Sequence, residues 1–213
     1  MKSALDPPWL TVRIPGPHRL LSWAPCNPGF VTGDRVVWRE VRDADLTEDF
    51  DALEWFARTL AARGEAGAVG LLTSRDLGKY RFETGVSGRT SATCLATVGL
   101  SNAERVGHRR VVESAEYGTI NLLAVADAPL SDAALVELLS IATQARTTAV
   151  MEHGPHLPSG RATGTGTDCI VVAAPPGAER YAGLHTEVGE AVGAAVYAAV
   201  ASGVRDWMEE QAR

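Results

Sequence analysis

Three threonines, two glycines and an aspartate are concentrated in residues 161–168, Arg-Ala-Thr-Gly-Thr-Gly-Thr-Asp, directly before the apolar run 169–174. Glycine permits positive φ and lets the backbone approach a bound group closely. A loop of this composition can aim N–H groups, hydroxyls and one carboxylate at one small volume, which suits a developing oxyanion or an orienting amide. It is not a phosphate-binding P-loop, because no lysine follows the glycines and the strand comes after the loop. The alternative is a turn whose threonines bond to neighbouring backbone.

Within this loop the foremost candidate for chemistry is Asp168. A carboxylate at the edge of an apolar strand costs free energy unless it is hydrogen-bonded or used. Thr165 and Thr167 are candidate nucleophiles if a base lies within hydrogen-bond reach. His185, which we expect in the first turn of the last helix, is a second candidate base because the helix dipole favours the neutral imidazole there. A surface or capping role is the alternative for this histidine.

Polar residues at two other strand ends are further candidates. Ser101 and Asn102 follow an apolar run that ends at Leu100, and residues at strand ends often form binding sites. Asn102 can orient an amide or donate to an oxyanion, or it can serve as a turn residue or helix N-cap. Asn121 interrupts another apolar run, where a buried amide group needs several partners.

Neither the histidines nor the cysteines predict a metal centre. His153 and His156 flank a Gly-Pro pair that breaks any helix, and no third ligand is near in the sequence. The three cysteines are widely spaced without a Cys-x-x-Cys pair, which fits a reducing compartment better than a disulfide scaffold. Cys94 and Cys169 lie in apolar strands and are expected to be small core residues, with a nucleophilic role as the alternative; the third cysteine is Cys26.

Composition sets the class of protein. A chain of 213 residues is long enough for one sizeable core and short for two full domains, so we expect one domain over residues 1–213. The net charge of −6 and the absence of a basic stripe argue against nucleic-acid and anionic-membrane partners. The first residues lack the apolar core of a signal peptide, and the longest uncharged run, 191–204, is too short to span a bilayer. We therefore expect a cytoplasmic protein.

Short apolar runs separated by turn residues predict strands. Pro15-Gly16-Pro17 predicts a turn between the first two, and a further turn is expected at 32–34. The strands at 81–86 and 93–100 are expected to pair across residues 87–89. The full set of predicted strands is 10–14, 19–23, 35–41, 68–73, 81–86, 93–100, 119–126 and 169–174.

Three helices follow from capping and periodicity. The first is predicted from Thr47 as N-cap, with Glu48 and Asp49 in the first turn and apolar Phe50, Leu53, Phe56 and Leu60 on one face, ending before Gly64. Ser131 is the predicted N-cap of the second helix. The third covers about 183–210, and its many small residues predict close packing. The chain is therefore expected to be α+β, with a mixed β-sheet packed against about three main helices.

Several short segments, in their order along the chain, resemble the adenosylcobinamide amidohydrolase family. Each motif alone is weak, but the ordered set is fairly specific and spans about residues 19–199. One departure concerns the central helix, where such proteins usually have Glu-Ala-Lys and this chain has Gln144-Ala145-Arg146. Glutamine cannot act as a base, and arginine is a bidentate clamp where lysine is a point charge. The matching segments are 70–73, 98–103, 118–121, 130–132, 162–168, and 181–183 with 185–186.

The resemblance implies hydrolysis of the amide that joins a corrin-ring propionyl side chain to aminopropanol, giving adenosylcobyric acid for cobalamin salvage. The partner would be a corrinoid small molecule; its cobalt belongs to the substrate, so no cofactor of the protein is implied. A wide cleft for the ring would have apolar walls, for which Trp9, Trp23, Trp38 and Tyr80 are candidates. A homo-oligomer is one open alternative for the assembly.

In the expected mechanism Asp168 or His185 is the general base that activates a water molecule. The oxyanion is held by backbone N–H groups of residues 164–167 together with Asn102. In the alternative, Thr165 or Thr167 attacks covalently. Two other functions stay open: a corrinoid-binding or trafficking module without turnover, and a hydrolase of a different small amide. The substrate-binding candidates are Ser101, Asn102, Asn121, Thr163, Gly164, Gly166, Gln144 and Arg146.

Overall fold

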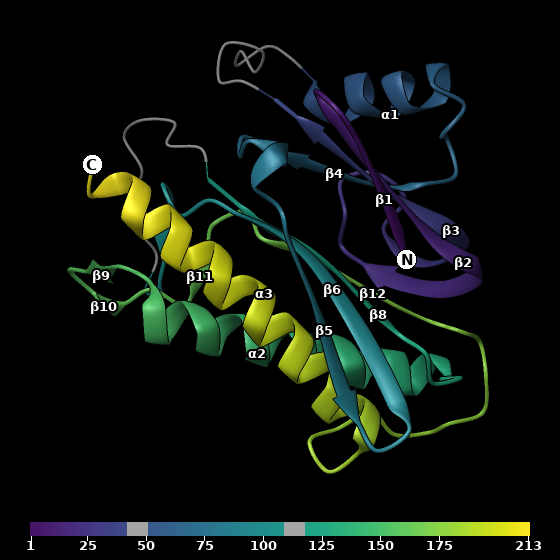
Figure 1. Cartoon of the computed structure of the whole chain (residues 1–213). Coiled ribbons are helices and arrows are strands. Elements are labelled where there is room, and N and C mark those ends of the chain that lie inside the picture. The colour runs from purple at the N-terminus through teal and green to yellow at the C-terminus, as the bar shows by residue number, and fades with distance from the viewer. Residues whose placement is uncertain (42–50, 109–117) are drawn as a thin grey trace.

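The computed structural model describes residues 1–41, 51–108 and 118–213. An eight-stranded sheet organises this part of the chain, in the order β4-β3-β2-β12-β8-β6-β5, with β1 paired to β2 (Figure 1). The strands are β1 (Lys2–Asp6), β2 (Trp9–Ser22), β3 (Gly29–Glu40), β4 (Val69–Thr73), β5 (Arg81–Ser87), β6 (Thr90–Val98), β8 (Ile120–Ala126) and β12 (Cys169–Ala174).

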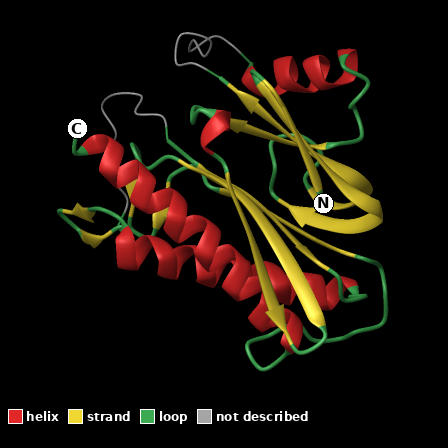
Figure 2. Cartoon of the chain, viewed as in Figure 1, coloured by secondary structure: helices red, strands yellow, loops and turns green. Residues whose placement is uncertain are grey.

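The sheet is mixed, because β3–β4 and β8–β12 are parallel and the other neighbours are antiparallel. Four short strands form two further pairs outside it: β7 (Ala103–Glu104) with β11 (Gly164–Thr165), and β9 (His156–Leu157) with β10 (Gly160–Arg161). Three α-helices lie in the described ranges: α1 (Ala52–Ala62), α2 (Asp132–His153) and α3 (Glu187–Gln211) (Figure 2). The predicted α+β class with a mixed sheet and three helices is confirmed.

The sheet has a separate apolar core on each side. On one face, α2 and α3 cover β5, β6, β8 and β12, and the alanines and valines of α3 fill the layer between them. On the opposite face, Leu95, Leu123 and Val171 pack against Val36 and Trp38 of the curled amino-terminal half of the sheet. A smaller cluster holds α1 against β3 and β4. In the part of the chain that is described, no helix is long and apolar enough to cross a membrane.

Two predicted turns proved wrong, because both lie inside long strands. The Pro15-Gly16-Pro17 segment belongs to the continuous strand β2, where the register with β3 shifts between Arg13 and His18. Such an irregularity leaves residues unpaired, so proline costs no ladder hydrogen bond there, and Gly16 takes the positive φ of 80° that the bend requires. The turn expected at 32–34 is likewise part of β3.

The first helix begins later than predicted. Its N-cap is Asp51, whose carboxylate accepts from the backbone N–H groups of Leu53 and Glu54. The expected cap Thr47 and the following residues Glu48, Asp49 and Phe50 lie outside the described residues. The end is as predicted, with Gly64 just beyond it at a φ of 72°.

The other two helices differ in how well the sequence located them. Ser131 is the N-cap of α2, as predicted. Helix α3 begins only at Glu187 and is capped by Thr186. His185 therefore precedes the helix and does not lie in its first turn, so the helix-dipole argument for a neutral base does not apply to it.

Close packing of α3 against the sheet is confirmed at Gly85 of β5. A Cβ atom built on this glycine would lie 2.1 Å from the carbonyl oxygen of Ala191. The backbones of β5 and α3 thus approach each other too closely for any side chain in between.

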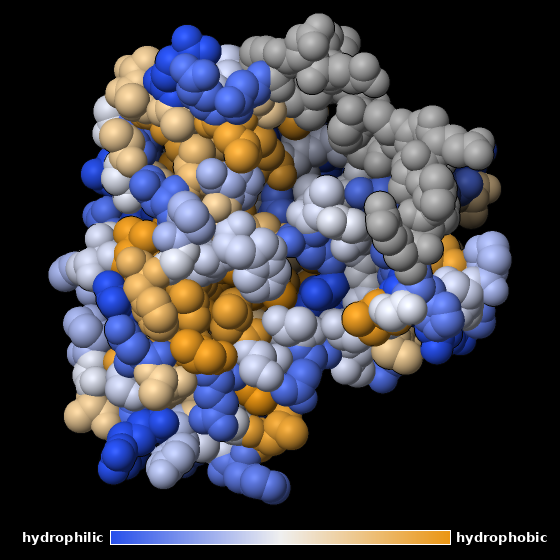
Figure 3. Space-filling model, turned by 180° about the vertical axis from the view of Figure 1, so that it is seen from behind, coloured by the Kyte–Doolittle hydropathy of each residue, from blue (hydrophilic) through white to orange (hydrophobic). Residues whose placement is uncertain are grey.

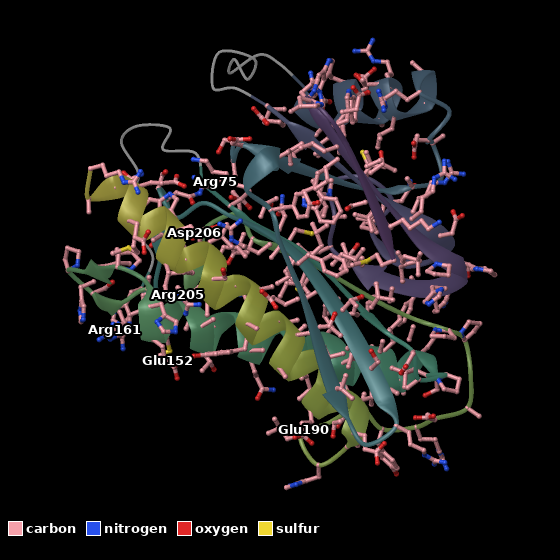
Figure 4. All side chains as sticks on the ribbon, viewed as in Figure 1. Arg75, Glu152, Arg161, Glu190, Arg205 and Asp206 are labelled. Carbon is pink, nitrogen blue, oxygen red and sulfur yellow. The ribbon has the colours of Figure 1, made fainter. Side chains whose placement is uncertain are left out.

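The last turns of α3 are tied by ion pairs to the β4–β5 connection and to the start of β5. Figure 4 labels two of the residues involved, Arg75 and Asp206. Glu210 accepts from Arg75 at 2.6 Å and from Lys79 at 3.0 Å, while Asp206 pairs with Arg81 of β5. The hydrogen bond from Arg75, followed by that from Lys79, lowers the pKa of Glu210 to about 2.

We expect Glu210→Gln to lower the free energy of unfolding at pH 7 by about 1 kcal/mol, a value discounted for the partial exposure of the carboxylate. The folded pKa of about 2 lies below the ordinary value of 4.5. The stabilisation is therefore complete above pH 4.5 and is lost as the pH falls through 2. Urea unfolding of both proteins between pH 7 and pH 3 measures this difference. Glu209→Gln, at an exposed neighbour, is the control; an equal effect of both variants would contradict the assignment.

Candidate functional site

The parallel pairing of β8 and β12 gathers most of the predicted site residues at one end of the sheet. Cys169 pairs with Asn121, so the two strands start side by side. Strand β6 is antiparallel to β8 and ends at the same place, with Val98 opposite Ile120. The loop 161–168, the turn after β6 and the middle of α2 meet there.

Asp168 is the centre of this cluster. Its Oδ1 accepts from the backbone N–H of Ile120 at 2.9 Å and from the hydroxyl of Thr165. Its Oδ2 accepts from the backbone N–H of Thr165 at 2.9 Å and from Nη1 of Arg146. These four donors occupy the lone-pair positions of the carboxylate, and its side chain is only 6% exposed. Asp168 is therefore arranged to hold the Thr165 hydroxyl rather than a free water molecule.

Arg146 compensates the charge of Asp168 and fixes the loop. Its side chain is 11% exposed, and Nη1 also donates to the backbone carbonyl of Thr163 at 3.1 Å. Gly164 makes room for this pair, because a Cβ atom there would lie 1.8 Å from Nη1 of Arg146 and 2.4 Å from Oδ2 of Asp168. The Nε atom of Arg146 is buried and has no acceptor among the described residues.

Asn102 and Thr167 form the neighbouring part of the cluster. The Thr167 hydroxyl donates to the carbonyl of Gly118 at 3.0 Å, so it can only accept from Asn102, whose Nδ2 lies 3.4 Å away. This fixes the orientation of the Asn102 amide and turns Oδ1 toward a buried position where no described residue donates to it. The Asn102 amide also flanks Gly166, since Nδ2 lies 3.8 Å from where a Cβ on this glycine would be.

Three other candidate residues, Asn121, Thr163 and Ser101, lie next to the cluster. Asn121 is 1% exposed; its Nδ2 donates to the carbonyl of Leu72 at 2.6 Å. The Thr163 hydroxyl accepts from the backbone N–H of Val106 at 2.8 Å. Ser101 is exposed in the turn after β6, and its backbone nitrogen packs against Gly118. Asn121 and Thr163 thus have protein partners that a substrate would have to replace.

Two candidates are not brought into the cluster. His185 is exposed and lies beyond the far end of β12, and this strand of six residues spans about 20 Å. Gln144 is exposed on α2 and donates to Ser140. Positions two apart on a helix do not share a face, so Gln144 points away while Arg146 reaches Asp168. The ion-pair partner of Arg146 is therefore Asp168, which lies in the loop before β12.

Of the four aromatic candidates for a substrate wall, one flanks the cluster. Trp9 and Trp38 are core residues with 7% and 0% exposure, and Tyr80 is partly buried. Trp23 is 46% exposed, and its Nε1 donates to the backbone carbonyl of Asp168 at 2.7 Å.

For one residue of the cluster, Thr119, the sequence predicted no role. The hydroxyl of Thr119 is bonded to the carbonyl of Thr167 at 2.9 Å and lies 3.2 Å from Oδ1 of Asn121. It anchors the end of the loop to the start of β8. Its sequence signals were its place between Gly118 and an apolar run, which is common to many strand starts, and its inclusion in the matching segment 118–121.

The cysteines are buried and free, as expected of core residues. Burial raises the pKa of the Cys169 thiol to about 12 and also raises those of Cys26 and Cys94. We expect no thiol to react with Ellman's reagent within minutes at pH 8 in the folded protein, and all three to react after unfolding. Rapid labelling of the native protein, with loss of activity, would show instead that a cysteine takes part in the chemistry. Over the residues described, no three His, Cys, Asp or Glu side chains converge on a metal site.

Comparison with known proteins gives the following matches. The family model described as adenosylcobinamide amidohydrolase matches residues 1–212. The uncharacterized protein MJ1613 of Methanocaldococcus jannaschii is 37% identical over 91 residues, which are 41% of this chain and 36% of that protein. A protein of Halobacterium salinarum named adenosylcobinamide amidohydrolase is 36% identical over 113 residues, 49% of this chain and 46% of its own length. The chain thus spans less than half the length of these curated relatives.

Among solved structures, an L-aminopeptidase D-Ala-esterase/amidase from Ochrobactrum anthropi matches with a TM-score of 0.36 and 14% identity, over 94% of this chain and 76% of that one. This likeness is too low to carry a conclusion about fold or chemistry.

Proposed function

Because the chain belongs to the adenosylcobinamide amidohydrolase family, we propose that it hydrolyses the amide between a corrin-ring propionyl side chain and aminopropanol in adenosylcobinamide, releasing adenosylcobyric acid for cobalamin salvage. The observation that supports a hydrolytic site most directly is the hydroxyl of Thr165, which donates to the buried carboxylate of Asp168. A nucleophile hydrogen-bonded to a base that is itself oriented by a third group, here Arg146, is the recurring arrangement in acyl transfer.

In the proposed first step Thr165 Oγ1 attacks the amide carbonyl carbon while its proton passes to Oδ1 of Asp168. Arg146 stays bonded to Oδ2 and keeps the carboxylate in place throughout. We favour covalent attack by Thr165 over direct attack by water, because four donors already occupy the lone pairs of the Asp168 carboxylate oxygens and leave none for a water molecule.

The oxyanion of the tetrahedral intermediate is assigned to the backbone N–H of Gly166 and to the second Nδ2 hydrogen of Asn102. The N–H of Gly166 has no acceptor within the described ranges, and the Asn102 amide lies beside it. One preorganised donor of this kind contributes on the order of 10²–10³ in rate.

Collapse of the intermediate breaks the C–N bond, and the leaving amine takes the proton from Asp168. The product is an ester between Thr165 and the propionyl group. Water then attacks this ester, gives a proton to Asp168, and displaces the threonine, which takes that proton back. The net reaction consumes one water molecule and yields a carboxylic acid and an amine.

The departure from the family pattern in the central helix does not weigh against turnover in this scheme. Gln144 lies outside the cluster, and Arg146 supplies the positive charge that Asp168 needs. A corrinoid-binding module without turnover would have no use for a hydroxyl aligned with a buried carboxylate, so we place hydrolysis ahead of binding alone.

The test is incubation of the purified protein with adenosylcobinamide, followed by mass spectrometry for adenosylcobyric acid and free aminopropanol. We expect both products in equal amounts. Binding of the corrinoid without released aminopropanol would favour the trafficking alternative. Absence of both binding and cleavage, with activity on simple amides, would favour a different amide hydrolase.

A further inference from the structure

Trp23 combines exposure with a fixed position next to the site. Its indole is 46% exposed, which is unusual for so large an apolar side chain. The ring is nevertheless held at its edge, because Nε1 donates to the backbone carbonyl of Asp168 at 2.7 Å. An aromatic ring that is held at one edge and nearly half exposed is suited to contact with another apolar group.

The neighbouring strand β3 contributes a second exposed aromatic residue, Phe30, which is 40% exposed. It pairs with Leu21 of β2, a buried residue two positions before Trp23. The guanidinium of Arg19 covers the Phe30 ring at 4.9 Å and is held by Asp132 of α2 at 2.9 Å. The face of the molecule seen from behind carries apolar residues in several areas, separated and bordered by polar ones (Figure 3).

Resting on the function proposed above, we propose that Trp23 is the wall against which the apolar face of the corrin ring stacks while the propionyl amide reaches Thr165. The corrin ring is too large to enter the buried space around Asp168, so it must be held outside with only a side chain inserted. Trp23 donates a hydrogen bond to Asp168, the residue that orients the nucleophile. We choose Trp23 over the other exposed aromatic residues because of this direct contact with the site.

Tyr181 provides the contrast. It is more exposed than Trp23, at 70%, but lies in the connection after the far end of β12. An effect of bare aromatic surface alone would appear at both positions, whereas a wall for the substrate would be sensitive only at Trp23.

The experiment measures binding of adenosylcobyric acid, which has no aminopropanol amide to cleave, by calorimetry to Trp23→Ala, Trp23→Phe and Tyr181→Ala. We expect at least about tenfold weaker binding for Trp23→Ala, less than threefold for Trp23→Phe, and no change for Tyr181→Ala. In turnover, KM for adenosylcobinamide should rise with Trp23→Ala. The kcat/KM for a small amide of propionate and aminopropanol should fall by a smaller factor than the kcat/KM for adenosylcobinamide, because the small amide loses only the effect of the Trp23–Asp168 hydrogen bond.

The result that overturns the proposal is unchanged corrinoid binding by Trp23→Ala. Equal losses on the corrinoid and on the small amide would also overturn it, because Trp23 would then act only by positioning Asp168. If the wild-type protein neither binds nor cleaves corrinoids, the proposed function itself fails and takes this inference with it. The thermal midpoints of the variants show whether each remains folded, and Trp23→Phe retains the ring where Trp23→Ala leaves a gap.

Discussion

Thr165→Val is expected to slow hydrolysis of adenosylcobinamide by at least about a thousandfold, since valine keeps the shape of threonine and removes the attacking oxygen. Binding of the corrinoid should change less than threefold, because ring contacts lie outside the Thr165–Asp168 pair. Single-turnover kinetics followed by mass spectrometry measure the chemical step directly. In the wild-type protein, rapid acid quenching should trap a propionyl ester on the peptide that contains Thr165.

Thr167→Val is the matched control, in the same loop and with the same change of atoms. The Thr167 hydroxyl donates to the Gly118 carbonyl and accepts from Asn102, so we assign it to loop geometry and to the orientation of the Asn102 amide. We expect a loss of about tenfold to a hundredfold, smaller than that of Thr165→Val. Thr165→Ser, which restores a hydroxyl, should recover most of the rate. A thousandfold loss in Thr167→Val with little change in Thr165→Val would transfer the nucleophile to Thr167. Small losses in both would return the mechanism to direct attack by water.

Arg146→Met is expected to lower the free energy of unfolding by about 3–5 kcal/mol. The loss arises because the 6%-exposed carboxylate of Asp168 would remain buried without its counter-charge. Urea unfolding at pH 7, followed by circular dichroism, measures the change. Hydrolysis should be lost as well, because the carboxylate would no longer be held in register with Thr165.

Gln144→Met tests whether the effect belongs to the pair or to the helix surface. This residue lies on the same helix but is exposed, and we expect a change below about 0.5 kcal/mol. Adding Asp168→Asn to Arg146→Met should recover part of the stability, because it removes the uncompensated charge. Equal small effects of Arg146→Met and Gln144→Met would contradict the buried pair.

Local patterns in the sequence located most of the second half of the fold. The cap at Ser131, the apolar run before Pro175 and the hairpin across residues 87–89 are encoded by neighbours along the chain, and each was found. The two turns expected in β2 and β3 failed because glycine and proline also mark irregularities inside long strands. Only pairing with a partner strand separates these two cases, and a single sequence does not contain that pairing.

The candidate site shows the same division. The sequence predicted a role for Asp168, Thr165 and Gly164 because their chemistry is concentrated in one short segment, and the structure places the three in one cluster. Arg146 contacts Asp168 because α2 packs against β12, and the sequence does not show this packing. Gln144 lies outside the cluster because positions two apart on a helix face different directions. His185 was misplaced by a helix start predicted four residues too early. Thr119 had no distinguishing signal, because its hydroxyl matters only through the carbonyl of a loop 48 residues later.

Strand β2 takes part in both halves of the sheet, since its first half pairs with β1 and its second half with β12. Strand β12, which follows Asp168, is therefore covered along one edge by the amino-terminal strands β1, β2 and β3. Removing these strands would expose the backbone N–H and C=O groups along that edge of β12 to solvent and to other chains. The amino-terminal strands thus stabilise the strand next to the candidate site, and we expect removal of β1 and β2 to abolish hydrolysis although no residue of the Asp168 cluster is removed.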